Sequence, residues 1–164
     1  CGGGNVVGVT SFTCNLHPLL WGYGGSSGDE LIETAGVMKW YSKLIKDTPN
    51  DLNGLFAFLE VLSVAPFPEH LHLKKMCGIV WAYTGDMDFA EETFKPIRAF
   101  KTPALDFVGA LPQPALQSMF DALYPAGYQW YWRADFVKEL SDEALEEHIK
   151  YGNILTTSTT TIHM

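Results

Sequence analysis

Two apolar stretches joined by a proline-rich loop constrain the fold of this chain more than any other feature. Residues 52–64 are rich in Leu, Phe and Val, and residues 73–83 form a second run of β-prone side chains. Pro66 and Pro68 lie between the two runs, where a strand could not keep its hydrogen-bond ladder. A strand, a loop and a strand in this order predict an antiparallel pair.

Helical patterns separate the β-prone runs. Ser27 and Glu30 have the spacing of a capping box, and apolar side chains recur at helical spacing behind them, so we expect a helix over residues 28–46. Asp86 or Asp88 would cap a second helix, in which Pro96 must produce a kink or an end. A short helix is predicted over residues 115–123 and a longer one over residues 141–150.

Further β-prone runs complete the expected sheet. They cover residues 6–16, 19–23, 102–109, 128–137 and 154–163. Strand pairs interrupted by single amphipathic helices predict the α+β class, with a mainly antiparallel sheet and its helices on one face. Because residues 55–62 and 129–136 are apolar or aromatic on both sides, we expect the open face of the sheet to meet a ligand, a partner chain or a second copy.

Length and charge exclude several classes of protein. With 164 residues the chain has the size of one domain, and 11 basic against 19 acidic residues give a net charge of −8. This charge disfavours nucleic acid and anionic membrane surfaces as partners. The sequence also contains no apolar run long enough for a membrane helix.

The cysteines indicate a compartment. Cys1, Cys14 and Cys77 are odd in number and widely spaced, and Cys14 and Cys77 lie among apolar, β-prone residues, which favours buried free thiols over a disulfide. Free thiols are typical of a reducing environment, so we expect a cytoplasmic protein. The start of the sequence at Cys-Gly-Gly-Gly suggests a piece of a longer chain.

Gly2, Gly3 and Gly4, followed by Asn5, form a loop whose backbone could approach a ligand closely. In a dinucleotide-binding unit such glycines follow a strand and open a helix, whereas here a predicted strand follows them. The Rossmann and P-loop interpretations are therefore rejected. A tight turn and a ligand-binding loop both remain open for this segment.

Several segments resemble one family in the same order along the chain. These are residues 2–5, 9–13 and 16–18, followed by 68–72, 78–85, 115–121 and 131–136. Together they resemble FAD-linked oxidases of the berberine-bridge-enzyme type. The resemblance implies that residues 1–164 are a single substrate-binding domain and that residues 1–10 are the remnant of a linker from an FAD-binding domain. It also implies FAD as the parent's cofactor, contacted by Gly2, Gly3, Gly4 and Asn5.

Candidate substrate contacts lie in the aromatic run 128–137. If this run is a strand, Tyr131, Arg133 and Asp135 share one face and would form a singly charged wall of a substrate pocket, as the resemblance also implies. The alternative is that Arg133 and Asp135 only pair with neighbours at the rim. Gln117 is a weaker candidate for the same wall.

A second possible site is the His70 and His72 pair. These histidines have the spacing that puts two rings on one face of a strand, but Glu69 is the nearest third ligand and the segment is predicted to be a loop. Because zinc sites need three or four protein ligands, we interpret both as solvated loop histidines and predict no metal site.

The resemblance also defines what this sequence does not contain. The Arg-Ser-Gly-Gly-His stretch that carries covalently bound flavin in the family is absent, as is the strand bearing its general base. We therefore expect the substrate-binding portion of an FAD-dependent oxidoreductase, which transfers hydride from an alcohol or amine carbon of a small molecule to flavin and is inactive as this isolated chain. The alternatives are a stand-alone small-molecule binding or dimerisation module and an α+β domain without an assignable role. A homodimer or a missing FAD domain would cover the open sheet face.

Overall fold

Three long antiparallel strands, β1 (Trp21–Glu30), β3 (Lys75–Tyr83) and β2 (Leu52–Glu60), form the centre of the fold. The structure, a computed structural model, describes residues 8, 10–16 and 18–164. Within these residues the sheet order is β4-β1-β3-β2-β6, and β5 also pairs with β1. The short strands are β4 (Leu105–Asp106), β5 (Gly109–Pro112) and β6 (Ile162–His163), and the helices are α1 (Thr34–Leu44), α2 (Ala90–Phe100), α3 (Gln113–Ser118) and α4 (Asp142–Gly152).

The predicted antiparallel pair is confirmed. Strands β2 and β3 run from the pair Leu52 and Tyr83 to the pair Glu60 and Lys75, and the loop between them contains a 3-10 turn at Glu69–Leu71. All pairings in the sheet are antiparallel, which agrees with the predicted α+β class.

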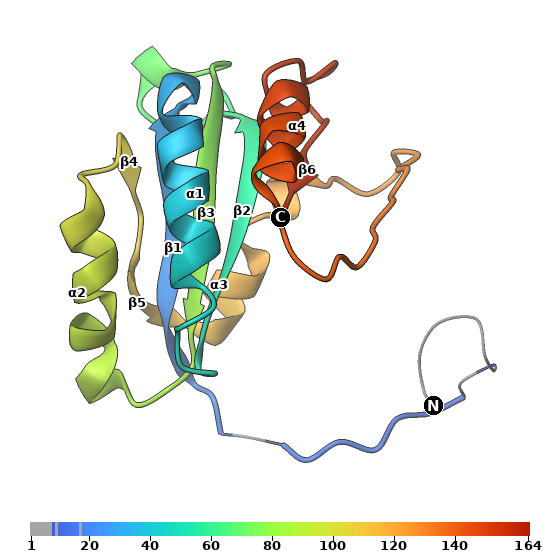
Figure 1. The fold of residues 1–164 in the computed structure, drawn as a ribbon. Helices are drawn as coiled ribbons and strands as arrows, with labels where there is room; N and C mark the ends of the chain where they lie inside the picture. The colour runs from blue at the N-terminus through green and yellow to red at the C-terminus, as the bar shows by residue number, and fades with distance from the viewer. Residues whose placement is uncertain (1–7, 9, 17) are drawn as a thin grey trace.

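The three eleven-residue helices cover one face of the sheet. Figure 1 shows α1, α2 and α4 on the same side of the strands. Alternate strand residues point toward them, and the core that they enclose includes Phe56, Phe58 and Trp81, each at most 1% exposed. Trp81 meets Tyr41 of α1 and Phe94 of α2 edge-on. Burial of aromatic side chains of this size drives the docking of the helices onto the sheet.

Helix α3 departs from the prediction of helices on one face only. It contacts β1 and β5. Gln113 lies against Gly22 of β1, at a strand position on the sheet face away from the three long helices. In Figure 1 α3 lies behind the strands as seen from α1. The face opposite the long helices is therefore partly covered from within the chain.

Strand β1 replaces the start of the predicted first helix. The capping box at Ser27 and Glu30 is wrong, because both residues lie in β1, and Ser27 Oγ accepts a hydrogen bond from Trp81 Nε1 at 3.2 Å. A 3-10 turn at Leu31–Glu33 precedes α1. Glycines permit this strand: a Cβ on Gly24 would lie 2.3 Å from the Trp81 carbonyl oxygen, and Gly25 has φ +133° beside Phe107. The predicted strand 19–23 is thus the beginning of a longer one.

Several smaller boundaries also differ. Residues 128–137 are not a strand, since no neighbouring strand pairs with them, and residues 8 and 10–16 of the predicted first strand have no strand structure either. Only Ile162–His163 of the predicted strand 154–163 pairs with the sheet, and residues 102–109 divide between β4, a loop and the first residue of β5. Helix α2 continues through Pro96 to Phe100.

Candidate functional site

The sheet face opposite the three long helices carries small and apolar side chains. Across β2 and β3 the directly paired residues on this face are Leu55 with Val80, Ala57 with Gly78 and Leu59 with Met76. Leu55 is 40% exposed, whereas Ala57 is 4% and Met76 is 3% exposed, so the face is open near Leu55 and covered farther along. An exposed apolar surface is typical of an interaction site.

A hollow of about 80 Å³ lies on this face. Its floor includes Ala57, Leu59 and Val80, and Met119, Phe120 and Leu123 from the segment after α3 form part of its wall. Glu60 is the only charged residue among the lining side chains. The hollow is therefore an apolar site, and it lies where two parts of the chain far apart in sequence meet.

An aromatic cluster lies at the β6 end of the same face. His163 pairs with Ala57 in the sheet register, and its Nε2 lies 3.3 Å from Tyr124 Oη. The Tyr124 ring contacts Trp130 and Trp132 at centroid distances of 5.5 and 5.2 Å. Burial lowers the pKa of His163, which favours a neutral ring in this cluster.

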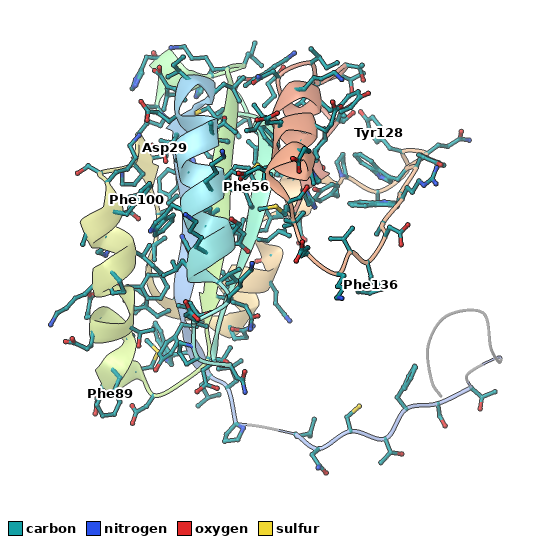
Figure 2. The ribbon with its side chains drawn as sticks, viewed as in Figure 1. Asp29, Phe56, Phe89, Phe100, Tyr128 and Phe136 are labelled. Atoms are coloured by element: carbon teal, nitrogen blue, oxygen red, sulfur yellow. The ribbon has the colours of Figure 1, made fainter. Side chains whose placement is uncertain are left out.

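The predicted substrate residues do not line the hollow. Gln117 is exposed on α3, while Tyr131, Arg133 and Asp135 are exposed in the irregular segment 128–137. Tyr131 is 86% exposed, and Figure 2 shows the labelled Tyr128 and Phe136 of this segment well away from the sheet. The shared strand face assumed for residues 131, 133 and 135 is wrong, because the segment has no pleat; their role toward substrate stays a prediction.

The predicted cofactor contacts Gly2, Gly3, Gly4 and Asn5 lie outside the described residues. Sequence reasoning missed the contribution of Met119, Phe120 and Leu123 to the hollow. The helical spacing of Leu116, Met119, Phe120 and Leu123 was the signal that could have identified an apolar face there.

The residues of the hollow do not fit a complete FAD. No Lys or Arg lines it, so the pyrophosphate of the cofactor would find no counter-charge there. A volume of about 80 Å³ is also well below the roughly 300–1,000 Å³ of a typical ligand pocket. The described part of the chain can offer one apolar wall to a flat molecule.

The two loop histidines, His70 and His72, differ in their contacts and exposure. The ring nitrogen Nε2 of His72 lies 2.9 Å from the carbonyl oxygen of Phe67, whereas His70 is exposed. Among residues 8, 10–16 and 18–164, no three His, Cys, Asp or Glu side chains are grouped so that they could hold a metal ion.

No helix in the described part of the chain has the length and apolar character needed to cross a membrane. Neither a scan of the sequence against protein-family models nor a search of curated proteins found a match. The family relationship is therefore a proposal.

Proposed function

We propose that this chain is the substrate-binding portion of an FAD-dependent oxidoreductase of the berberine-bridge-enzyme type. Such an enzyme transfers a hydride from an alcohol or amine carbon of a small molecule to flavin, and the isolated chain is inactive. The observation that carries the proposal is the apolar sheet face around Leu55, Ala57 and Val80, with its hollow, opposite the helix-covered face. The resemblance of the sequence implies a sheet of this kind over a flavin ring.

The charges around the hollow support separate roles for this chain and for the rest of the enzyme. Because no cation lines it, the phosphates and ribose of FAD would be held by a different part of the enzyme, and this chain would position the substrate. The thiols of Cys14 and Cys77, which are both free, support placing the enzyme in the cytoplasm.

Lumiflavin tests the proposal, since it has the flavin ring system without ribityl chain or phosphates. We expect weak binding of lumiflavin to the 164-residue chain, measured by quenching of its fluorescence, and no tighter binding of FAD. Leu55→Lys should reduce the affinity because it places a charge on the apolar face. Phe89→Lys is the matched control, since Phe89 is 62% exposed at the start of α2, away from this face in Figure 2. Equal effects of the two substitutions would contradict the proposal.

The second candidate is a stand-alone binding or dimerisation module. It is favoured by the exposed apolar side chains of Leu55, Tyr131 and Phe136. Sedimentation equilibrium separates the two candidates: a module of this kind forms a dimer that Leu55→Lys or Phe136→Ser dissociates. A chain that stays monomeric and binds lumiflavin supports the oxidoreductase portion instead.

A further inference from the structure

A cavity of about 230 Å³ lies on the other side of the sheet, between α1, α2 and β1. Its floor includes Ser27 and Trp81 of the sheet, and Phe94 and Ile97 of α2 line one wall. Trp40 of α1 and Phe100 of α2 stack across the gap between the helices, with ring centroids 4.2 Å apart and planes within 6°. The cavity is therefore separate from the apolar sheet face, and aromatic, aliphatic and charged side chains line it together.

The charged end of the cavity is lined by Asp29, Asp106, Arg98 and Lys101, and Glu33 lies beside it, next to Lys101. Asp29 has a side chain only 10% exposed and pairs with Lys101 at 2.9 Å, and Lys101 also reaches Glu33 at 3.4 Å. On the α2 side, Arg98 pairs with Asp106 and donates to the Val108 carbonyl oxygen at 3.0 Å. Counting Glu33, which lies beside the cavity and not in its lining, three carboxylates share two cations here.

Lys101 can leave Asp29 without losing its own partner. Its side chain is 31% exposed and has the more exposed carboxylate of Glu33 as a second acceptor. Asp29, in contrast, is the most buried acid of the group and would be left as a strong acceptor inside the cavity. A ligand ammonium group can therefore replace Lys101 at Asp29 with the local charge balance improved.

The volume of the cavity and its aromatic side chains indicate which group the ligand carries besides the ammonium. Cavities of about 150 Å³ admit benzene, so about 230 Å³ accommodates one aromatic ring with a short side chain. Trp40 and Phe100, which are partly exposed, offer apolar contact and cation–π attraction to such a molecule, whereas Trp81 lies fully buried behind them. An anion would add a fourth negative charge beside Asp29, Glu33 and Asp106, and Arg98 is already engaged by Asp106.

We propose that this cavity is a binding site for a small arylalkyl ammonium ion, with the ring against Trp40 and Phe100 and the ammonium group on Asp29. Figure 2 shows Asp29 and Phe100 on the side of the molecule where α1 and α2 lie next to each other. The site is independent of the proposed substrate face, because it lies across the sheet from it.

Calorimetric titration of the 164-residue chain with three ligands of similar shape tests this site. We expect 2-phenylethylamine to bind about tenfold or more tightly than 2-phenylethanol, because a buried charge-assisted hydrogen bond is added, and 3-phenylpropionate to bind weakest. Equal affinities for amine and alcohol would overturn the proposal. So would amide chemical shift changes confined to residues 55–59 instead of residues near Asp29 and Lys101.

Variants test the role of Asp29 and of its competitor. Asp29→Asn should remove the preference for the amine, whereas Lys101→Met should tighten amine binding because it frees Asp29. Lys95→Met is the matched control, since Lys95 pairs with Glu92 on the exposed side of α2. Thermal melts confirm that each variant is folded. If Asp29→Asn does not fold, Lys101→Met decides: weaker or unchanged amine binding in this variant would overturn the proposal.

Discussion

Two glycines in helices should respond in opposite directions to substitution by alanine. Gly152 is buried at the end of α4, and a Cβ there would lie 2.3 Å from Cδ1 of Phe58, which is itself 1% exposed. Ordinary contacts begin near 3.4 Å, so the helix end or the ring would have to move by about 1.1 Å (3.4 − 2.3). Gly36 in α1 is exposed, with nothing within 4 Å of its added Cβ.

The expected free energies follow from these environments. Overpacking a core costs roughly 1–3 kcal/mol, and a displacement of about 1.1 Å places this site in the upper part of that range. Because alanine regains about 1 kcal/mol of helix propensity, Gly152→Ala should lower the free energy of unfolding by about 1–2 kcal/mol. Gly36→Ala should raise it by roughly 0.5–1 kcal/mol. Urea unfolding followed by circular dichroism measures both, and the m-value should not change. A Gly152→Ala variant as stable as Gly36→Ala would refute the docking of α4 on Phe58.

Three further predictions concern titratable groups. Burial raises the pKa of Tyr41 to about 12, and its hydroxyl donates a hydrogen bond to the Gly54 carbonyl oxygen at 2.6 Å. The contribution of Tyr41 to the free energy of unfolding should therefore be complete below pH 10 and be lost as the pH rises from 10 to 12. Tyr41→Phe should lack this loss in pH-dependent urea unfolding, and an unchanged loss would contradict the assignment. Burial lowers the pKa of His163 below its ordinary value near 6.5. Acid should therefore weaken the contact of β6 with Tyr124 as the pH falls through 6.5 and below. Tryptophan fluorescence should report this change, and His163→Gln should abolish it. Burial also raises the pKa of the Cys77 thiol, so iodoacetamide should modify exposed Cys14 in the native chain but Cys77 only after unfolding, as peptide mass mapping can measure.

The parts of the fold that sequence reasoning predicted are those in which the hydrophobic pattern determines the local structure. The β2 and β3 strands and their antiparallel pairing follow from two apolar runs around a proline-rich loop. Helix α4 begins as predicted, because Ser141 Oγ accepts a hydrogen bond from the Ala144 amide at 3.3 Å. Cys14 and Cys77 are free thiols as predicted, but only Cys77 is buried; the predicted burial of Cys14 is wrong, because residues 10–16 form no strand that would pack into the core.

The secondary structure predicted from the sequence was wrong where long-range contacts determine the local structure. Gly24, Gly25 and Gly28 are poor strand formers by propensity, yet β1 exists because these positions lie against the backbones of β3 and the segment 105–108. Conversely, residues 128–137 have strand-forming side chains but no partner strand. The spacing of residues 116–123 indicates an apolar face, but it does not show that this face packs on the sheet to form the hollow. The contact of Tyr124 with His163 joins residues 39 positions apart, and local sequence does not predict such a contact.

We propose that the sheet face around Leu55 and Val80 is the wall that the chain offers to a flavin and its substrate. Nuclear magnetic resonance of the 164-residue chain during titration with lumiflavin tests it most directly. We expect the largest chemical shift changes at Leu55 and Val80, the accessible pair on this face. Changes confined to the α1 and α2 side, or none at millimolar lumiflavin, would contradict it.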